Sequence, residues 1–367
     1  MTQIGILTNW GVPNYGTFLQ AYAMQKVIQE MCPETMVNQI AYLNKQHYDM
    51  YYSLFDVKYR MFIINPRTYI NGFKKIHIRK LSLPFQKYYE RIPHTALLEN
   101  GEKQFDLVVL GSDIMWAYTM AHNRDDVKLF GIGLGAERII SYAPSCGSAG
   151  RETEVPPYVA SGLKNMAAIS VRDEQSADFV QRITGSRPEV VLDPTFLWDF
   201  ETDKNVVEPS ITEEYLLVYG SFFSEELVNG AVNYAKQNAL KIICLDSLGD
   251  KFDWCDRIIR MKELSPFEWV GYFKKATMIM TCTFHGLMFS FILKKPVVFH
   301  PTKFVMDKVD DLIEKLDLKE VLIEKQTFEE KRRFDWDYSL INQKLIPLRD
   351  ASLRYLKEAL LYGEQKG

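Results

Sequence analysis

The stretch QIGILTNWGVPNYGTFLQAYAM, residues 3–24, decides the fold class. It opens with a short apolar run at 4–7 and passes through a polar turn that contains two glycines. It then enters a segment, 17–31, with the length and periodicity of a helix. A buried strand followed at once by a helix is the first half of a βαβ unit. The stretch therefore predicts an α/β protein.

The same alternation continues along the chain. Most of the further strand candidates are continuous apolar runs, which is typical of parallel strands that are buried on both faces. A helix is predicted at 174–183, and another opens at Ser265-Pro266-Phe267-Glu268, a capping box with proline at the first helical position. The further predicted strands are 37–41, 105–110, 139–142, 168–171, 190–192, 215–219, 240–245, 278–281 and 296–299.

The segment DFETDKNVVEPSIT, residues 199–212, is the best domain boundary, because it is acidic and polar, contains a proline and lacks periodicity. It predicts two α/β domains, 1–200 and 210–330, which suits a chain of 367 residues. Residues 331–367 read as terminal helices that are interrupted at Pro347. Their predicted packing stripe consists of Leu348, Leu353, Leu356 and Leu360.

The composition excludes several classes of protein. Hydrophobic residues make up 47% and charged residues 25%, as in globular proteins, and the formal net charge of −3 argues against a dedicated nucleic-acid binder. Five cysteines without CxxC spacing and six scattered histidines predict no metal site. The N-terminus does not resemble a secretory signal, and the uncharged run 276–293 is too polar at its centre for a membrane span. We expect a cytoplasmic, metal-free protein.

Residues 58–91 differ from the rest of the chain. They carry nine Lys or Arg and one acid, a net charge of +8, so the remainder carries −11. Aromatic residues are interleaved with these cations, and the segment belongs to a predicted insertion at about 44–100. It is either a surface for anionic lipid or a lipid-linked substrate, or an amphipathic insertion whose Lys and Arg stems cover apolar surface.

The turn 8–17 is the first candidate binding element. Gly11 and Gly16 permit positive φ angles and a close approach of the backbone. The N-terminus of the following helix offers free N–H groups to a ligand, which makes Asn14, Tyr15 and Gly16 candidates. The alternative is an ordinary β–α turn.

The string GSDIMW, residues 111–116, follows the predicted strand 105–110, and ligands of open α/β sheets bind beyond the carboxyl ends of strands. Asp113 can bind a hydroxyl group or act as a base, and Ser112 can bind phosphate. Trp116 is counted with them as an acceptor-binding candidate. The alternative for Asp113 is a helix cap.

The string SVRD, residues 170–173, also ends a predicted strand. Arg172 can bind a phosphate or carboxylate with two parallel hydrogen bonds, or it can form an ion pair with a nearby acid. Asp173 is a natural helix N-cap, and Asp193, before Pro194, is predicted to bind backbone in a turn.

The string TCTFHG, residues 281–286, is the sharpest candidate site. His285 lies where a buried strand passes into a helix, whose positive end favours a neutral imidazole and an anionic ligand. The histidine then serves as a general base or hydrogen-bonds a phosphate. The alternative is a core histidine with its hydrogen bonds satisfied. Cys146 and Cys282 read as packing residues.

Taken in order, these motifs resemble the polysaccharide pyruvyl transferase family. The resemblance implies two Rossmann-like domains that face each other across a cleft, as in GT-B glycosyltransferases. It also implies transfer of the pyruvyl group of phosphoenolpyruvate to sugar hydroxyls, usually as a cyclic ketal, with release of phosphate and no cofactor. The matching strings are NYGTFLQAYAM (14–24), GSDIMW (111–116), YAPSCG (142–147), SVRD (170–173), VLDPT (191–195) and TFHG with KKPV (283–297).

The resemblance places the important histidine at His285 and a phosphoenolpyruvate-binding arginine at Arg172. For the implied reaction, His285 is the candidate for acid/base work and Asp113 the candidate for binding the acceptor hydroxyls. Several family members have an arginine two residues before the histidine, where this chain has Thr283. Binding of the phosphoenolpyruvate donor is then weaker at this position, or other cationic side chains supply it. The lysines that can supply it are Lys294, Lys295 and Lys303.

The implied partners are phosphoenolpyruvate and a glycan or lipid-linked oligosaccharide, with peripheral membrane contact through 58–91 and no nucleic acid. Two other functions stay open. One is a nucleotide-sugar-dependent glycosyltransferase of the GT-B type. The other is a catalytically silent protein that binds a sugar or an anion.

Overall fold

The computed structural model describes residues 3–47, 92, 94–97, 105–246, 252–260, 263–323 and 326–361. The basic segment 58–91 lies outside the described residues, as does most of the predicted insertion. The chain divides into two compact units. The first unit is Met1–Trp198 together with Arg349–Gly367, and the second is Asp199–Leu348.

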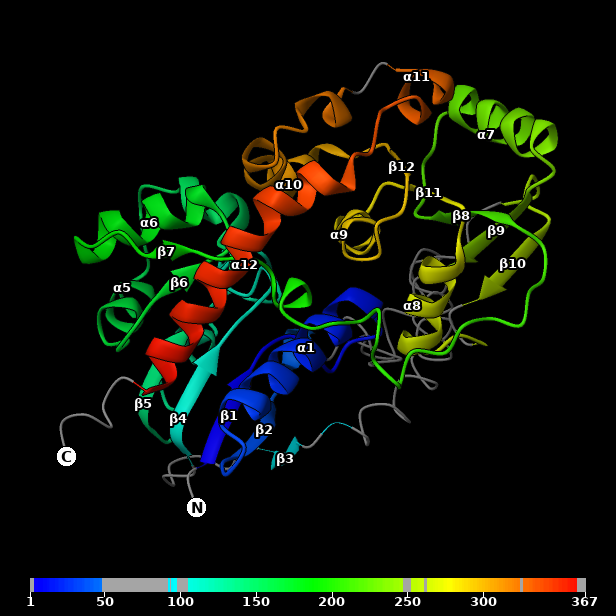
Figure 1. Cartoon of the computed structure of the whole chain (residues 1–367). Helices are drawn as coiled ribbons and strands as arrows, with labels where there is room; N and C mark the ends of the chain where they lie inside the picture. Colours follow the sequence, from blue (N-terminus) through cyan, green and yellow to red (C-terminus); the bar gives the residue numbers. More distant parts are fainter. Residues whose placement is uncertain are drawn as a thin grey trace, which may run out of the picture. The chain divides into compact units, whose positions relative to one another are not determined.

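The first unit is built on a parallel five-stranded sheet with the order β3-β2-β1-β4-β5. Helices cover both of its faces, which explains why its strands are continuous apolar runs. Helix α1 (Tyr15–Met31) and the end of α12 (Tyr338–Leu361) pack on one face, and α5 (Pro157–Lys164) and α6 (Glu174–Thr184) pack on the other (Figure 1). The strands are β1 (Gln3–Leu7), β2 (Met36–Ala41), β3 (His94–Leu97), β4 (Phe105–Leu110) and β5 (Ala136–Ser141).

Two predicted strands form a separate small sheet. Strands β6 (Ser170–Val171) and β7 (Glu189–Val190) pair with each other, and one bridge, Ile140 to Ala168, joins this region to β5. Strand β6 begins two residues later than the predicted 168–171, because Ala168 makes only the isolated bridge. Strand β7 ends two residues before the predicted 192, where the chain turns into η3 (Pro194–Phe196). Two other short 3₁₀ helices are η1 (Val127–Phe130) and η2 (Gly147–Arg151).

The second unit repeats the same architecture with the order β10-β9-β8-β11-β12. Helices α7 (Glu225–Gln237) and α11 (Phe328–Arg332) cover one face. On the other face, α8 (Pro266–Lys275) and α9 (Phe284–Ile292) bury a cluster of rings in which the Trp269 centroid lies 4.1 Å from Phe273 and 5.0 Å from Phe289. The remaining elements are β8 (Tyr215–Tyr219), β9 (Lys241–Asp246), β10 (Arg257–Arg260), β11 (Met278–Thr281), β12 (Val297–Phe299), α10 (Lys303–Lys315) and η5 (Lys319–Leu322).

In both sheets, the direction in which successive strands are added reverses at one position, which we call the turning point. In each, the second and third strands are added outward on one side of the first strand, and the next two on its other side. The turning points lie between β1 and β4 and between β8 and β11. Ligands of open α/β sheets bind at the carboxyl ends of such strand pairs, so the loops that follow these four strands are the first places to examine.

The predicted local signals are confirmed in part. Ser265 Oγ accepts from Glu268 N at 3.0 Å, and Glu268 Oε2 accepts from Ser265 N at 2.8 Å, which is the predicted capping box. The glycine turn is different from the prediction. Helix α1 begins at Tyr15, so Gly16 lies inside it, and neither Gly11 nor Gly16 has a positive φ.

The C-terminal segment also differs from the prediction. Helix α12 runs through Pro347 without a break, and the two units share it. Proline removes one backbone hydrogen bond from a helix. Here buried apolar side chains hold the helix before and after Pro347. Leu345 is buried in the second unit, and Leu356 and Leu360 are buried in the core of the first.

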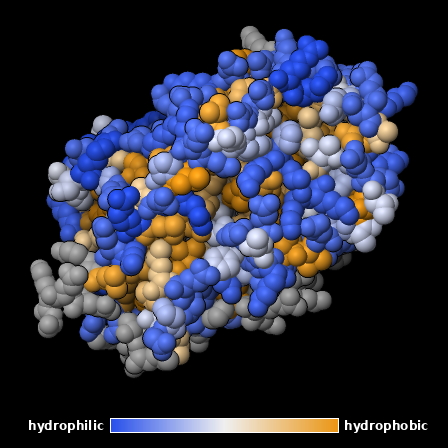
Figure 2. Space-filling view, in the orientation of Figure 1, coloured by the Kyte–Doolittle hydropathy of each residue, from blue (hydrophilic) through white to orange (hydrophobic). Residues whose placement is uncertain are grey.

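Hydrophilic residues cover most of the face shown in Figure 2, with apolar patches between them. Within the described ranges, no helix combines the length and the apolar character that a bilayer crossing requires.

Candidate functional site

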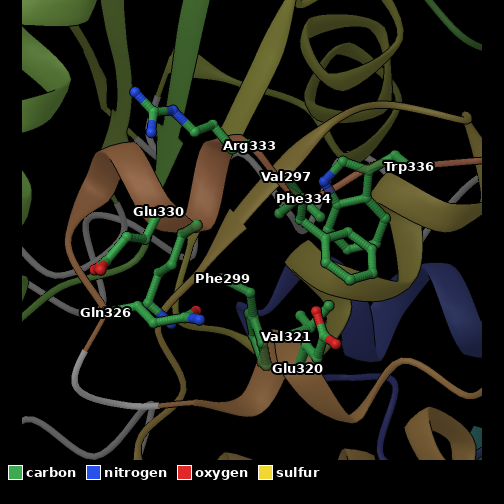
Figure 3. Close-up of a pocket in the computed structure, with 10 residues that line it drawn as sticks. Val297, Phe299, Glu320, Val321, Gln326, Glu330, Arg333, Phe334 and Trp336 are labelled. Carbon is green, nitrogen blue, oxygen red and sulfur yellow. The ribbon is translucent and has the colours of Figure 1, made fainter.

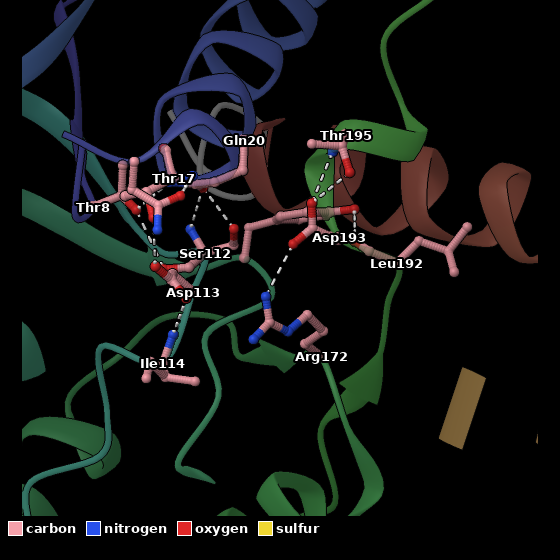
Figure 4. A network of polar contacts seen from close by, with 12 residues as sticks. Thr8, Thr17, Gln20, Ser112, Asp113, Ile114, Arg172, Leu192, Asp193 and Thr195 are labelled. Carbon is pink, nitrogen blue, oxygen red and sulfur yellow. Dashed lines mark hydrogen bonds and ion pairs between the residues drawn. The ribbon is translucent and has the colours of Figure 1, made fainter. Parts of the chain in front are cut away.

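A buried polar network fills the turning point of the first unit. Gln20 of α1 is its centre: its Oε1 accepts from Ser112 Oγ at 2.6 Å, and its Nε2 donates to Thr8 Oγ1 at 3.0 Å and to Thr17 O at 2.9 Å (Figure 4). Thr8 Oγ1 in turn donates to Ser112 O at 3.3 Å. Ser112 is fully buried. The network therefore joins the loops after β1 and β4. The Ser112 hydroxyl hydrogen-bonds within the protein and is not directed to a phosphate, the role that the sequence analysis had suggested.

Asp113 stands at the rim of this network. It is half-buried, its Oδ1 accepts from Ile114 N at 2.8 Å, and its Oδ2 accepts from Thr17 Oγ1 at 3.4 Å (Figure 4). Its φ of 72° lies in the left-handed region, which is uncommon outside glycine and asparagine. The loop thus turns the carboxylate toward α1 and the carboxyl edge of the sheet, where a ligand can reach it.

Gly111 explains why the loop can turn there. Its φ is 120°, and a Cβ at this position would lie 2.1 Å from the carbonyl oxygen of Tyr142. No side chain fits in that space, so the close approach of β4 and β5 requires glycine at this position.

Arg172 and Asp193 form a buried ion pair in the same unit. Arg172 Nη1 lies 3.0 Å from Asp193 Oδ2, and their side chains are 6% and 1% exposed (Figure 4). Asp193 Oδ1 also accepts from Thr195 N at 3.0 Å and from Thr195 Oγ1 at 2.7 Å. The charge of Arg172 is therefore matched within the protein, and Asp193 binds the turn backbone as predicted. Asp173 is the predicted N-cap of α6 and accepts from Ser176 N at 2.8 Å.

Three predicted candidates in this unit have other surroundings. Asn14 caps α1 and accepts from Thr17 N at 3.1 Å. Tyr15 is buried. Trp116 is fully buried, donates its Nε1–H to Leu129 O at 2.9 Å and stacks on Phe130. The two aromatic side chains belong to the core and do not line the edge with Asp113.

Two histidines that the sequence analysis did not single out lie near Asp113. The rings of His47 and His122 are 4.7 Å apart, centroid to centroid. Burial and, to a smaller extent, the neighbouring His122 lower the pKa of His47 from 6.5 to about 4, against an opposing effect of the Asp113 carboxylate. Burial lowers the pKa of His122 as well, again against Asp113. No motif spacing connects residues 47, 113 and 122, so only the fold reveals the group.

His47 makes a pH dependence of stability testable. Its pKa is lower in the folded chain than its ordinary value of 6.5, so the unfolded chain binds the proton more tightly, and stability falls as pH drops from about 6.5 toward about 4. We expect the wild type to lose about 2 kcal/mol more unfolding free energy than His47→Gln between pH 7 and pH 5. Urea denaturation at the two pH values measures this, and equal losses in both proteins would contradict the assignment.

The second unit holds His285 in the first turn of α9, directly after β11. The residue is half-buried, its Nε2 is buried, and its ring packs edge-on against Phe284 at 4.9 Å. Thr283 is the N-cap of α9, and its Oγ1 accepts from Gly286 N at 3.0 Å. Thr283 therefore caps the helix at the position where several family members have an arginine.

The loop around His285 is fixed to the neighbouring strand. Thr281 Oγ1 donates to Tyr219 O at 2.6 Å, and the Cys282 thiol donates to Ser221 O at 3.3 Å. A Cβ on Gly286 would lie 2.1 Å from Thr281 Oγ1, so glycine is required beside the histidine. The loops after β8 and β11 are thus joined at the turning point of this sheet.

The three candidate lysines lie at different ends of the second unit. Lys294 and Lys295 follow the C-terminus of α9, which lies about 10 Å along the helix axis from His285. Lys294 Nζ is 3.4 Å from Glu201 Oε2. Lys303 instead opens α10, directly beyond the carboxyl end of β12, which pairs with β11. Lys303 shares the edge of His285, and Lys294 and Lys295 do not.

A cavity of about 160 Å³ lies beside the edge strand β12, and none of the predicted site residues lines it (Figure 3). Two of its polar side chains serve the local structure. Glu330 belongs to the capping box of α11, and Lys331 Nζ donates to Ile323 O at 2.6 Å. Phe334 and Trp336 form an aromatic wall, with ring centroids 4.7 Å apart. Over the residues that the structure describes, no group of three His, Cys, Asp or Glu side chains has an arrangement that could hold a metal ion.

The fold and the two edges define a class: α/β proteins with two Rossmann-like units of the GT-B type. Solved structures with this fold match nearly the whole chain. The S. aureus MnaA–UDP complex is 13% identical, with 99% of this chain and 97% of that chain covered and a TM-score of 0.51. A UDP-N-acetylglucosamine 2-epimerase is 12% identical (100% and 97% covered, TM-score 0.52), and a Listeria monocytogenes protein described as such an epimerase is 10% identical (100% and 97%, TM-score 0.53).

The sequence assigns the chain to a family, which is a narrower class than the fold. The sequence profile of the polysaccharide pyruvyl transferases matches residues 14–299, and the chain belongs to this family. That range includes the loops that follow β4, β8 and β11, with Asp113 and His285. A search of curated protein sequences finds no significant match.

Proposed function

We propose that this protein transfers the pyruvyl group of phosphoenolpyruvate to hydroxyl groups of a polysaccharide or of its lipid-linked precursor. The observation that carries the proposal is the position of His285, a titratable side chain in the first turn of α9 at the turning point of the second sheet. The donor is a cytoplasmic metabolite, so we propose that the protein acts in the cytoplasm.

The edge of the second unit suits an anionic donor. Helices α9 and α10 follow the neighbouring strands β11 and β12, and neither has an acidic residue in its first turn. Helix α7, after β8, has Glu225 and Glu226 there. Free N–H groups and the positive end of a helix stabilise phosphate and carboxylate groups, and Lys303 adds a cation at α10. This arrangement supports a donor site that needs no arginine at position 283.

The proposed reaction makes two demands on these residues. In the first step, one sugar hydroxyl oxygen attacks the central carbon of the donor as the methylene carbon gains a proton. In the second step, the other hydroxyl oxygen attacks the same carbon, and the bond from this carbon to the phosphate oxygen breaks. Of the two hydroxyl protons, one ends on the new methyl group and the other on phosphate. We assign the proton at the methylene carbon to His285 and the orientation of the acceptor to Asp113.

Incubation of the protein with phosphoenolpyruvate and a panel of oligosaccharides, free and polyprenyl-linked, tests the proposal. We expect phosphate release that depends on the acceptor, and a pyruvylated product by mass spectrometry. Nucleotide release from a sugar donor would instead support a glycosyltransferase, and binding without turnover would support a silent binding protein. Either result would overturn the proposal.

The two exposed lysines give a matched comparison. Lys303→Ala removes the cation at the edge of His285, and we expect the KM for phosphoenolpyruvate to rise about 10-fold, as for loss of one charge-assisted contact. Lys294→Ala removes an exposed ion pair beyond the other end of α9 and should leave this KM within about twofold. Steady-state kinetics measures both, and an effect of Lys294 that equals that of Lys303 would refute the placement.

A further inference from the structure

His47 and His122 form a fixed pair in the first unit. Their ring planes meet at 32°, with centroids 4.7 Å apart. Asn44 holds both segments, because its Oδ1 accepts from His47 N at 2.8 Å and its Nδ2 donates to His122 O at 2.6 Å. Asn44 is itself fixed by Asp126, whose Oδ2 accepts from Asn44 Nδ2 at 2.6 Å. Two histidines that are 75 residues apart are thus positioned by one asparagine.

The Asp113 carboxylate lies close enough to this pair to act electrostatically on both rings. The three residues come from loops that the sheet brings together. His47 follows β2, and Asp113 and His122 follow β4. Thr17, which donates to Asp113, lies in α1 after β1. Strands β2, β1 and β4 are neighbours, so their loops converge at the turning point where such folds bind ligands.

The chemistry of this group favours a neutral ligand that is rich in hydroxyls. With a pKa of about 4, His47 is neutral at pH 7, so it offers no positive charge to a phosphate. A neutral imidazole has one donor and one acceptor, and a carboxylate accepts only. Sugar hydroxyls both donate and accept. The nearby cation Arg172 is already paired with Asp193. Neither His47 nor Arg172 therefore offers an unmatched positive charge to the anionic donor, whereas the imidazoles and the carboxylate offer a sugar both donors and acceptors.

We propose that His47, His122 and Asp113 bind the hydroxyl groups of the acceptor sugar, so that the first unit determines which sugar is used. The proposal rests on the function proposed above. It assigns a binding role to two histidines and leaves the proton transfer at the donor to His285.

The kinetic test uses His122→Gln, with His94→Gln as the control. His122 is half-buried at the proposed subsite, whereas His94 is an exposed residue on the edge strand β3 of the same unit. We expect His122→Gln to raise the KM for the oligosaccharide at least 10-fold, with the KM for phosphoenolpyruvate within twofold and no effect of His94→Gln. An unchanged acceptor KM, or a change in the phosphoenolpyruvate KM instead, would overturn the proposal.

A binding test separates this proposal from the transfer activity. Saturation-transfer NMR with methyl glycosides of galactose, glucose and mannose reports sugar binding without turnover. We expect a signal with the wild type and His94→Gln, and a loss of at least fivefold with His122→Gln and with Asp113→Asn. If Asp113→Asn does not fold, His122→Gln carries the test. Equal signals in wild type and His122→Gln, or none in the wild type, would overturn the subsite. A signal that depends on His122 without any pyruvyl transfer would keep the subsite and reject the proposed function.

Discussion

His285→Gln is expected to lower kcat for pyruvyl transfer by about 10²–10⁴-fold, the range that a positioned acid/base group contributes. Glutamine fills similar space and keeps a hydrogen-bonding end, but it cannot exchange a proton near neutral pH. The backbone of α9 should not change, because Thr283 caps the helix through its own hydroxyl and the two loops are tied by Thr281 and Cys282. The loss should therefore appear in turnover and not in the folded fraction.

Two further measurements make this result specific. Thermal unfolding of the variant should match that of the wild type within a few degrees, and phosphoenolpyruvate should still protect the protein, because the N–H groups of α9 and the Lys303 cation remain. His94→Gln serves as the control for loss of an imidazole elsewhere. If His285→Gln retains full kcat, the histidine is a structural residue of the strand–helix junction, and the donor chemistry must be assigned to another side chain.

The sequence predicted the parts of the fold that depend on local signals. Continuous apolar runs identified most strands of both sheets, and the capping box at Ser265 identified the start of α8. It missed β10, whose two ends are the charged residues Arg257 and Arg260, because an edge strand carries polar residues that weaken the apolar pattern. It also interrupted α12 at Pro347, where packing against both units outweighs the lost hydrogen bond.

The candidate site was less accessible to sequence reasoning. Motif strings pointed to Asp113 and His285, because each lies just beyond the end of a strand at a turning point. The strings could not distinguish side chains that line the edge from side chains that support it, and Trp116 proved to be a core residue. His47 and His122 belong to no string, and they lie near Asp113 only because β2 and β4 flank β1 in the sheet.

Asp193→Ala is expected to destabilise the first unit by about 3–5 kcal/mol, the cost of leaving a buried charge without its partner. The substitution removes the carboxylate beside Arg172 and also the acceptor of the Thr195 N–H and hydroxyl. Asp193→Asn keeps the shape and removes the charge, so it should show most of the loss. Arg172→Ala should cost less, because Asp193 then still accepts the two hydrogen bonds from Thr195. Urea denaturation measures all three.

The same variants decide between the two roles that sequence reasoning left open for Arg172. If Arg172 is a structural partner of Asp193, Arg172→Ala lowers the unfolding free energy, and the folded fraction keeps a KM for phosphoenolpyruvate within about threefold of the wild type. If it grips the donor, this KM rises by 10-fold or more while stability changes little, as for loss of a charge-assisted pair to phosphate or carboxylate. The buried position of the pair, with side chains 6% and 1% exposed, favours the first outcome. A large increase in this KM for Arg172→Ala, together with an unchanged stability of Asp193→Ala, would contradict the structural role. Arg172 in the first unit would then be assigned to donor binding.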